Sequence, residues 1–193
     1  MVYLYLIGSW LIYFAIHSAL ASNVVKKQFP SRFYRIIYNL IAILGLLGIF
    51  TFTAFQPIHY LFPKSGLAQI IGLMLATYGI LILKKAFKQY SIKQFLGIEV
   101  VETSEKSLNT SGILQYVRHP IYTATILLVS GFFFFAPTAL NLVSALCIFA
   151  YFIIGIQLEE RKLIDEFGDD YRQYQAEVPM LFPKGMKWGN LLK

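Results

Sequence analysis

The chain has 193 residues, of which 57% are hydrophobic and 14% are charged, and its formal net charge is +7. This balance excludes a soluble globular protein, because no soluble core of this size can bury so many Phe, Leu and Ile side chains. The positive charge does not require a nucleic acid as partner, since membrane topology and attraction to anionic lipid headgroups account for it. Cys147 is the single cysteine, so a disulfide framework and a cysteine-based metal cluster are excluded, and we expect no metal.

Long runs without charge predict an all-α fold that crosses a membrane five times, at about 20 residues per crossing. We expect the first run to be a retained helix, because no basic region precedes it and it carries His17. We expect one domain over residues 1–193, with three helices in 1–88 and a cofactor-binding half with two helices in 89–193. In chain order the runs are Val2–Ser22, Ile36–Phe62, Ser65–Leu83, Pro120–Ser144 and Ala145–Leu158, the last two joined tightly at Pro137.

The lysine and arginine residues lie almost entirely on one side of the predicted helices. They follow the first, third and fifth helices and precede the fourth, whereas Lys64 alone lies on the other side. The positive-inside rule therefore places the N-terminus of this integral membrane protein outside and its C-terminus in the cytoplasm. Every acidic residue, from Glu99 to Glu177, falls in the two C-terminal cytoplasmic segments. We therefore expect the polar chemistry, and a cofactor site, on the cytoplasmic face.

Two polar clusters flank the last predicted hairpin. The first, Arg118-His119-Pro120-Ile121-Tyr122, stands at the start of the fourth helix, where proline suits the first helical position. The second, Glu159-Glu160, stands where the fifth helix leaves the membrane, and Phe167-Gly168 beyond it is typical of a helix C-cap. Taken singly, the first cluster fits an interfacial anchor and the second fits a solvated turn. Together, at the ends of a membrane hairpin where charge is costly, they indicate a functional site.

The two clusters, in this order, resemble the C-terminal half of the isoprenylcysteine carboxyl methyltransferase superfamily, which are integral membrane methyltransferases that use S-adenosylmethionine. The resemblance implies that this cofactor is bound by a short segment before and around a glycine, by the His-Pro-x-Tyr motif and by the Glu-Glu pair. The corresponding positions in this chain are Lys106, Leu108, Asn109, Leu114, His119, Pro120, Tyr122, Glu159 and Glu160.

These residue types suit the chemical groups of S-adenosylmethionine. A carboxylate such as Glu159 can accept hydrogen bonds from the ammonium group or the ribose, while His119, Arg118 and N–H groups at a helix start can receive the cofactor carboxylate. Tyrosine rings can flank the sulfonium by cation–π attraction. Methyl transfer is an in-line displacement that depends on positioning and on exclusion of water more than on acid–base groups. The candidate catalytic residues are Arg118 and His17.

Two positions depart from the pattern of the family. An aromatic residue often found two positions after the glycine is Leu114 here, so the contact is weakened or is supplied by Tyr116. Enzymes that methylate prenylcysteine carboxylates carry an arginine four residues before the cofactor glutamate, where this chain has Gly155. The loss of a cation that would pair with a carboxylate argues against carboxyl methylation.

The N-terminal half and the end of the chain resemble the methanethiol S-methyltransferase branch of the superfamily. This branch is bacterial, so the resemblance implies a bacterial inner membrane. It rests on His17-Ser18-Ala-Leu-Ala21-Ser22, Val25-Lys26, Arg32-Phe-Tyr34-Arg35-Ile-Ile-Tyr38-Asn39-Leu40 and Val178-Pro-Met-Leu-Phe-Pro183. A thiol acceptor needs no arginine to bind it, which agrees with Gly155, and His17 can help to deprotonate a thiol.

We therefore expect methyl transfer from S-adenosylmethionine to a small or lipophilic acceptor, with a thiol favoured, by an enzyme in contact with membrane lipids. One alternative is carboxyl O-methylation of an isoprenylcysteine-like substrate. A second is a nicotinamide-binding enzyme of the sterol reductase type, although those chains are much longer. A third is a non-enzymatic membrane accessory or transport protein on the same scaffold, which Leu114 and Gly155 keep open.

Overall fold

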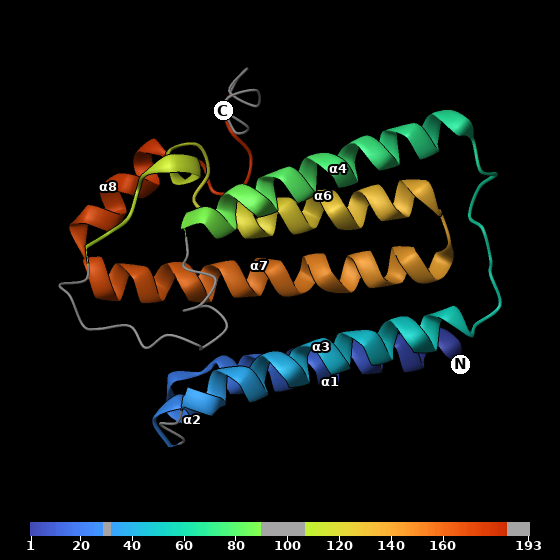
Figure 1. Ribbon diagram of the computed structural model, residues 1–193, viewed down its shortest axis with the longest axis horizontal. Helices are drawn as coiled ribbons and strands as arrows, with labels where there is room; N and C mark the ends of the chain where they lie inside the picture. Colours follow the sequence, from blue (N-terminus) through green and yellow to red (C-terminus); the bar gives the residue numbers. More distant parts are fainter. Residues whose placement is uncertain (29–31, 90–106, 185–193) are drawn as a thin grey trace.

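The computed structural model describes residues 1–28, 32–89 and 107–184, and the regular structure of these residues is all helical. Five long helices run side by side along the molecule, with α7 between the pair α4 and α6 and the pair α1 and α3 (Figure 1). The elements are α1 (Val2–Ala21), α2 (Asn23–Gln28), α3 (Arg32–Ala54), α4 (Gly66–Gln89), the 3-10 helix η1 (Gly112–Gln115), α6 (Pro120–Phe135), α7 (Ala139–Phe167) and α8 (Asp169–Glu177).

Four helices in the described residues are long and apolar enough to cross a membrane, namely α1, α3, α4 and α7. The fifth apolar helix, α6, has only 16 residues. The all-helical fold is therefore confirmed for the described residues, with four of the five predicted crossings long enough to span. The first and third predicted runs begin within one residue of α1 and α4. The second run, predicted over Ile36–Phe62, is wrong at its end, because α3 ends at Ala54, shortly before Pro57. Many apolar side chains on the helices are exposed, as expected for surfaces that face lipid.

The predicted boundary between the last two helices is wrong. The helix expected over Pro120–Ser144 ends at Phe135, and the next begins at Ala139 and not at Ala145. Thr138 explains the shift, because its side chain accepts a hydrogen bond from the N–H of Asn141 at 3.1 Å and so caps α7. The side-chain amide of Asn141 also donates to the carbonyl oxygen of Ala136 at 2.7 Å, which fixes the turn.

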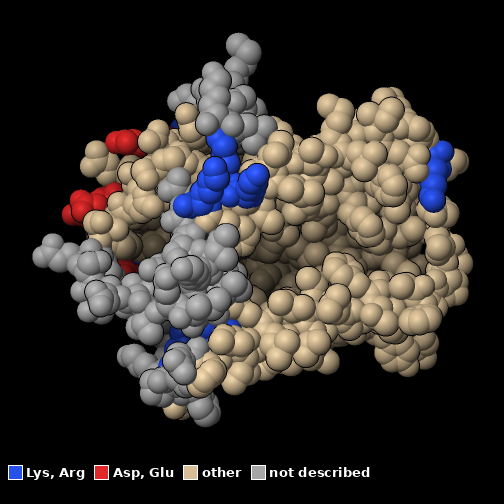
Figure 2. All heavy atoms as spheres, viewed as in Figure 1, with Lys and Arg blue, Asp and Glu red and all other residues tan. Residues whose placement is uncertain are grey.

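The last turns of α7 extend beyond its apolar part. A helix of 29 residues is about 44 Å long, whereas the hydrocarbon core of a bilayer is about 30 Å thick. The excess is the charged end that begins at Glu159. Gly168 ends the helix with φ +57°, as the C-cap pattern predicts, and α8 follows at once. Figure 2 shows acidic side chains gathered at this end of the molecule and a largely uncharged surface along the helices.

The helices α4 and α6 pack closely against each other. A Cβ atom on Gly72 would lie 2.6 Å from the carbonyl oxygen of Gly131, and a Cβ atom on Gly131 would lie 2.6 Å from that of Gly72. Two glycines at the contact thus let the two backbones approach each other, a common device in membrane helix pairs. On the other side, α7 packs on α1 through stacked rings of Phe14 and Tyr151, with centroids 4.1 Å apart.

Candidate functional site

The start of α6 is held by the segment that follows α8. The backbone N–H of Arg118 donates to the carbonyl oxygen of Pro179 at 3.0 Å, and that of His119 donates to Met180 at 3.1 Å. The hydroxyl of Thr123, which is fully buried, donates to the carbonyl oxygen of Leu181 at 2.6 Å. The first polar cluster is therefore placed beside the charged end of α7, because the chain folds back after α8 (Figure 1).

Glu160 is the centre of a buried hydrogen-bond network. Its Oε1 accepts from Nε and Nη2 of Arg118 at 2.8 and 2.6 Å and lies 3.1 Å from Nε2 of His119. Its Oε2 accepts from the side-chain amide of Gln175 at 3.0 Å. Nη1 of Arg118 donates to the carbonyl oxygens of Gln175 and Val178, at 3.0 and 2.5 Å. The side chains of Arg118 and Glu160 are 8% and 12% exposed, so the two charges pair with each other inside the protein and face little solvent.

The electrostatics of Glu160 follow from these contacts. Burial alone would raise the pKa of this carboxyl group, but hydrogen bonds from Arg118 and His119 and their positive charge outweigh burial, so the pKa lies below its ordinary value. Tyr171 on α8 lies with its hydroxyl 3.5 Å from the same Oε1. Burial, and next the negative charge of Glu160, raise the pKa of the Tyr171 hydroxyl. Glu160 is thus a charged carboxylate at neutral pH.

Glu159 differs from its neighbour because it faces outward. Its side chain is 48% exposed, and its Oε2 lies 3.8 Å from Nδ1 of His119. It also shares a hydrogen bond with the hydroxyl of Tyr122. The buried ring of His119 therefore lies between two carboxylates, one near each ring nitrogen. The carboxylate of Glu160 is therefore bound to protein groups, whereas that of Glu159 is accessible.

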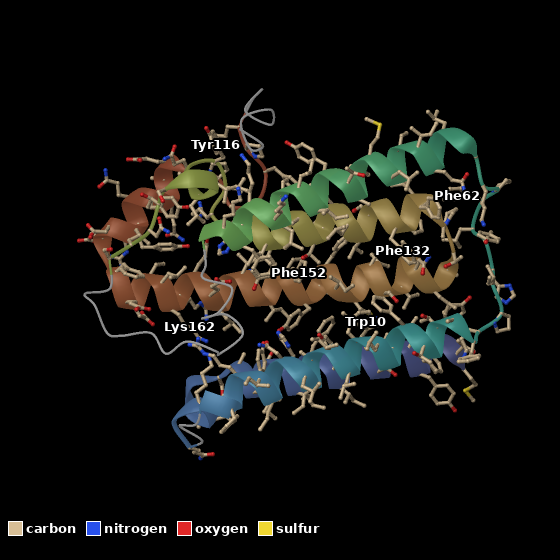
Figure 3. All side chains as sticks on the ribbon, in the orientation of Figure 1. Trp10, Phe62, Tyr116, Phe132, Phe152 and Lys162 are labelled. Carbon is tan, nitrogen blue, oxygen red and sulfur yellow. The ribbon has the colours of Figure 1, made fainter. Side chains whose placement is uncertain are left out.

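Tyr122 is held over the same region by aromatic contacts. Its ring is perpendicular to that of His119, with centroids 5.6 Å apart, and also to that of Phe152 at 4.8 Å. Figure 3 labels Phe152, which lies between α6 and α7. A Cβ atom on Gly155 would lie 3.2 Å from the Tyr122 hydroxyl oxygen. Gly155 therefore leaves the space that the Tyr122 hydroxyl occupies.

The segment before α6 lines a cavity next to α8. A cavity of about 600 Å³ lies between this segment and α8, and Leu108 and Tyr174 are among the residues that line it. Leu114 is buried in a core cluster with Ile82 and Val117, and its carbonyl oxygen accepts a hydrogen bond from the Tyr174 hydroxyl at 2.6 Å.

The other residues of this segment complete the predicted set. Asn109 accepts hydrogen bonds from the backbone N–H and the hydroxyl of Ser111, at 3.0 and 2.8 Å. Tyr116, labelled in Figure 3, packs against the core cluster that holds Leu114. Lys106 lies outside the described residues.

The structure thus brings together His119, Pro120, Tyr122, Glu159 and Glu160, as the sequence predicts, and holds Arg118 with them. His17 belongs to a separate group on α1, with its Nε2 3.0 Å from the Tyr38 hydroxyl and its ring near Tyr151. Sequence reasoning missed Gln175 and Tyr151, and it placed Tyr38 in a family motif without giving it a role. Nothing in the sequence singles out Gln175.

The residues present fit a sulfonium methyl donor. Glu159 offers an accessible carboxylate to an ammonium or a ribose, and Tyr122 offers an aromatic ring beside it. The first-turn N–H groups of α6 provide donors for a carboxylate at a helix start. In the described residues no group of three His, Cys, Asp or Glu side chains is placed to hold a metal ion.

Comparisons with known proteins identify the family of the chain. The family described as phospholipid methyltransferase matches residues 67–170. Methanethiol S-methyltransferase 2 of Bradyrhizobium diazoefficiens is 33% identical over 87% of this chain and 68% of its own length. Methanethiol S-methyltransferase 1 of the same species is 44% identical over 42% of this chain and 28% of its own length. Protein-S-isoprenylcysteine O-methyltransferase of Xenopus laevis is 31% identical over 61% and 42%.

The alignments thus span about two thirds of one of these relatives and less than half of the other two. No solved structure matches the chain. The superfamily that the two polar clusters predict is confirmed by these matches.

Proposed function

We propose, on the premise that the chain belongs to the phospholipid methyltransferase family, that it transfers a methyl group from S-adenosylmethionine to the sulfur of a thiol. The bound cofactor supplies an electrophilic methyl group on a positively charged sulfur. In the transfer, the acceptor sulfur forms a bond to the methyl carbon while the methyl–sulfonium bond breaks, and the thiol proton is released. The products are a thioether, S-adenosylhomocysteine and a proton.

The observation that carries this proposal is the different environment of two adjacent carboxylates. Glu159 is accessible beside His119 and Tyr122, whereas Glu160 is neutralised by Arg118. We assign Glu159 to the ammonium or ribose of the cofactor and Tyr122 to its sulfonium. Arg118 and Glu160 are positioning residues, because their polar atoms already bind protein groups. Other contacts come from the predicted segment with Lys106, Leu108, Asn109 and Leu114, and from the helix start at Pro120.

A thiol is favoured as acceptor because the guanidinium group among the described site residues, that of Arg118, is already paired with a carboxylate. Gly155 stands where the carboxyl-methylating enzymes carry an arginine, and Arg118 is already paired with Glu160. Bringing a carboxylate into an apolar pocket without a partner costs several kcal/mol. A neutral thiol avoids this cost on entry. We assign the thiol proton to His17, whose ring nitrogen lies 3.0 Å from the Tyr38 hydroxyl.

The test is calorimetric titration of the detergent-purified protein with S-adenosylmethionine, S-adenosylhomocysteine and NADPH, followed by radiolabelled methyl transfer. We expect binding of the first two and thioether formation from alkyl thiols. Binding of NADPH instead would support the reductase alternative, and binding of none would support an accessory protein. Ester formation on a farnesylcysteine analogue with little thioether would support carboxyl methylation, the activity named for the Xenopus relative.

We further propose that the chain is one domain with five crossings, its N-terminus outside and its C-terminus with the cofactor site in the cytoplasm of a bacterial inner membrane. The 16 residues of α6 span about 24 Å, and α6 runs beside α4 and beside the part of α7 nearest the turn at Pro137 (Figure 1). Basic residues follow α1 and lie near the C-terminal end of α4, which favours this orientation. A Cys147→Ala protein with a new cysteine at Lys64 or Lys184 should label from opposite sides. Labelling of both from one side would contradict the topology.

A further inference from the structure

A long groove runs along the seam between α1 and α3, outside the site described above. Its volume is about 330 Å³, and most of its lining is apolar, with Ile12, Ile16 and Ile41 among its walls. These three side chains are 62%, 46% and 39% exposed, so the groove is open to the surroundings of the helices. In the membrane those surroundings are lipid chains. An apolar groove open to lipid admits a hydrocarbon chain without a passage through water.

Glycines on α3 keep the groove wide. A Cβ atom on Gly48 would meet no atom within 4 Å, whereas one on Gly45 would lie 2.8 Å from the ring of Tyr13. Both glycines line the groove. Gly48 therefore faces open space inside the groove, and a side chain placed there would fill it without moving the protein.

The groove has a polar end. His17 and Tyr38 line it and contact each other across the seam, with Nε2 3.0 Å from the hydroxyl oxygen. A histidine and a tyrosine on membrane helices are costly unless they face a polar function. The neighbouring Ser18 contacts the hydroxyl of Tyr151 on α7 at 3.0 Å.

This polar end lies on the side of the candidate cofactor site. Tyr151 precedes Glu159 by eight residues of α7, which is about 12 Å along the helix. The ring of Tyr151 lies near that of Phe152, with centroids 6.4 Å apart, and Phe152 contacts the ring of Tyr122 at 4.8 Å. These contacts lead from the polar end of the groove toward the residues assigned to the methyl donor.

We propose that the groove between α1 and α3 binds the hydrocarbon chain of the methyl acceptor, an alkyl thiol of several carbons whose sulfur lies at the His17–Tyr38 end. The inference rests on the proposed function, which it makes more specific. The volume falls at the lower end of the range of about 300–1,000 Å³ that is usual for small-molecule sites. A one-carbon thiol fills only a small part of such a space. The acceptor is therefore an amphiphile that enters sideways from the bilayer.

The test compares 1-decanethiol with ethanethiol as acceptors for three proteins: the unchanged chain, Gly48→Leu and Gly8→Leu. Gly8 on α1 is the matched control, because a Cβ atom there also meets nothing within 4 Å but Gly8 does not line the groove. We expect Gly48→Leu to lower kcat/KM for decanethiol at least tenfold and to leave the value for ethanethiol within twofold. Gly8→Leu should change neither value more than twofold.

A binding measurement accompanies the kinetics. Decyl methyl sulfide, the thioether product, should raise the melting temperature of the unchanged chain and of Gly8→Leu but not that of Gly48→Leu. Equal kcat/KM for decanethiol in all three proteins, or an equal loss for both thiols in Gly48→Leu, would overturn the groove assignment while the thiol methylation stands. If the unchanged chain methylates neither thiol, the proposed function itself fails.

Discussion

Changing Glu159 and Glu160 to glutamine should affect different properties. We expect Glu160→Gln to lower the stability of the fold and Glu159→Gln to lower the affinity for the cofactor. Glu160→Gln removes the charge that pairs with Arg118, in a contact of 2.6 Å whose two side chains are 8% and 12% exposed. Breaking a buried ion pair costs about 3–5 kcal/mol. Because Arg118 keeps two carbonyl acceptors, we expect the lower value, about 3 kcal/mol of unfolding free energy.

Glu159→Gln should behave in the opposite sense. Its side chain is 48% exposed, and surface substitutions usually change stability by less than about 0.5 kcal/mol. Loss of a charge-assisted hydrogen bond to the cofactor should weaken binding by roughly 1.5–3 kcal/mol, or about ten- to a hundredfold.

Thermal unfolding in detergent and calorimetric titration with S-adenosylhomocysteine separate the two effects. In a chain of this size 1 kcal/mol corresponds to about 2–4 °C, so Glu160→Gln should melt about 6–12 °C lower and Glu159→Gln within about 2 °C of the unchanged protein. At a temperature where all three are folded, Glu159→Gln should show the larger loss of affinity. A normal melting temperature for Glu160→Gln together with unchanged affinity for Glu159→Gln would refute the division of roles.

Three further predictions concern the same region. Gly155→Ala should lower cofactor affinity several-fold with little change in melting temperature, because its Cβ atom would press on the Tyr122 hydroxyl at 3.2 Å; calorimetry checks this, and an unchanged affinity would contradict it. Tyr174→Phe should cost about 1–2 kcal/mol in thermal unfolding, because the buried carbonyl oxygen of Leu114 loses its donor, while cofactor affinity stays within a few-fold. The depressed pKa of Glu160 stabilises the fold above the ordinary pKa of 4.5, and this stability is lost as pH falls below that value; melting temperatures from pH 7 down to pH 3 should therefore decline less for Glu160→Gln than for the unchanged chain.

Hydropathy predicts the membrane helices because their length is imposed by the thickness of the bilayer. The starts of α1 and α4 lie where the uncharged runs place them, and Gly168 ends α7 as expected, whereas α3 ends at Ala54 and not at Phe62. The start of α7 after Thr138 was not predicted, because a count of uncharged residues does not detect helix caps. Here the cap is the hydrogen bond from the N–H of Asn141 to the Thr138 hydroxyl. The relevant signal was Pro137 followed by threonine, which is a helix start that polarity alone does not reveal.

The roles within the candidate site depend on contacts between residues distant in sequence. The motifs predict which residues gather, since His119 and the Glu-Glu pair meet as expected. They do not say which glutamate is buried. That choice is made by Gln175 and by the carbonyl of Val178, which reach Arg118 and Glu160 only because the chain folds back after α8.

The absence of a side chain at Gly155 has two consequences for the site, one electrostatic and one steric. In the sequence, Gly155 stands where the carboxyl-methylating enzymes carry an arginine. The absence of that cation by itself favours a neutral acceptor over a carboxylate. In the structure, Gly155 also leaves the space beside the Tyr122 hydroxyl, since a Cβ atom would lie 3.2 Å from that oxygen. Any side chain at this position would therefore require the Tyr122 hydroxyl to shift by a few tenths of an ångström. That shift is limited, because the Tyr122 ring also contacts His119 and Phe152. Conversion of this site to bind a carboxylate therefore depends both on the added cation and on how far the Tyr122 hydroxyl can move beside it.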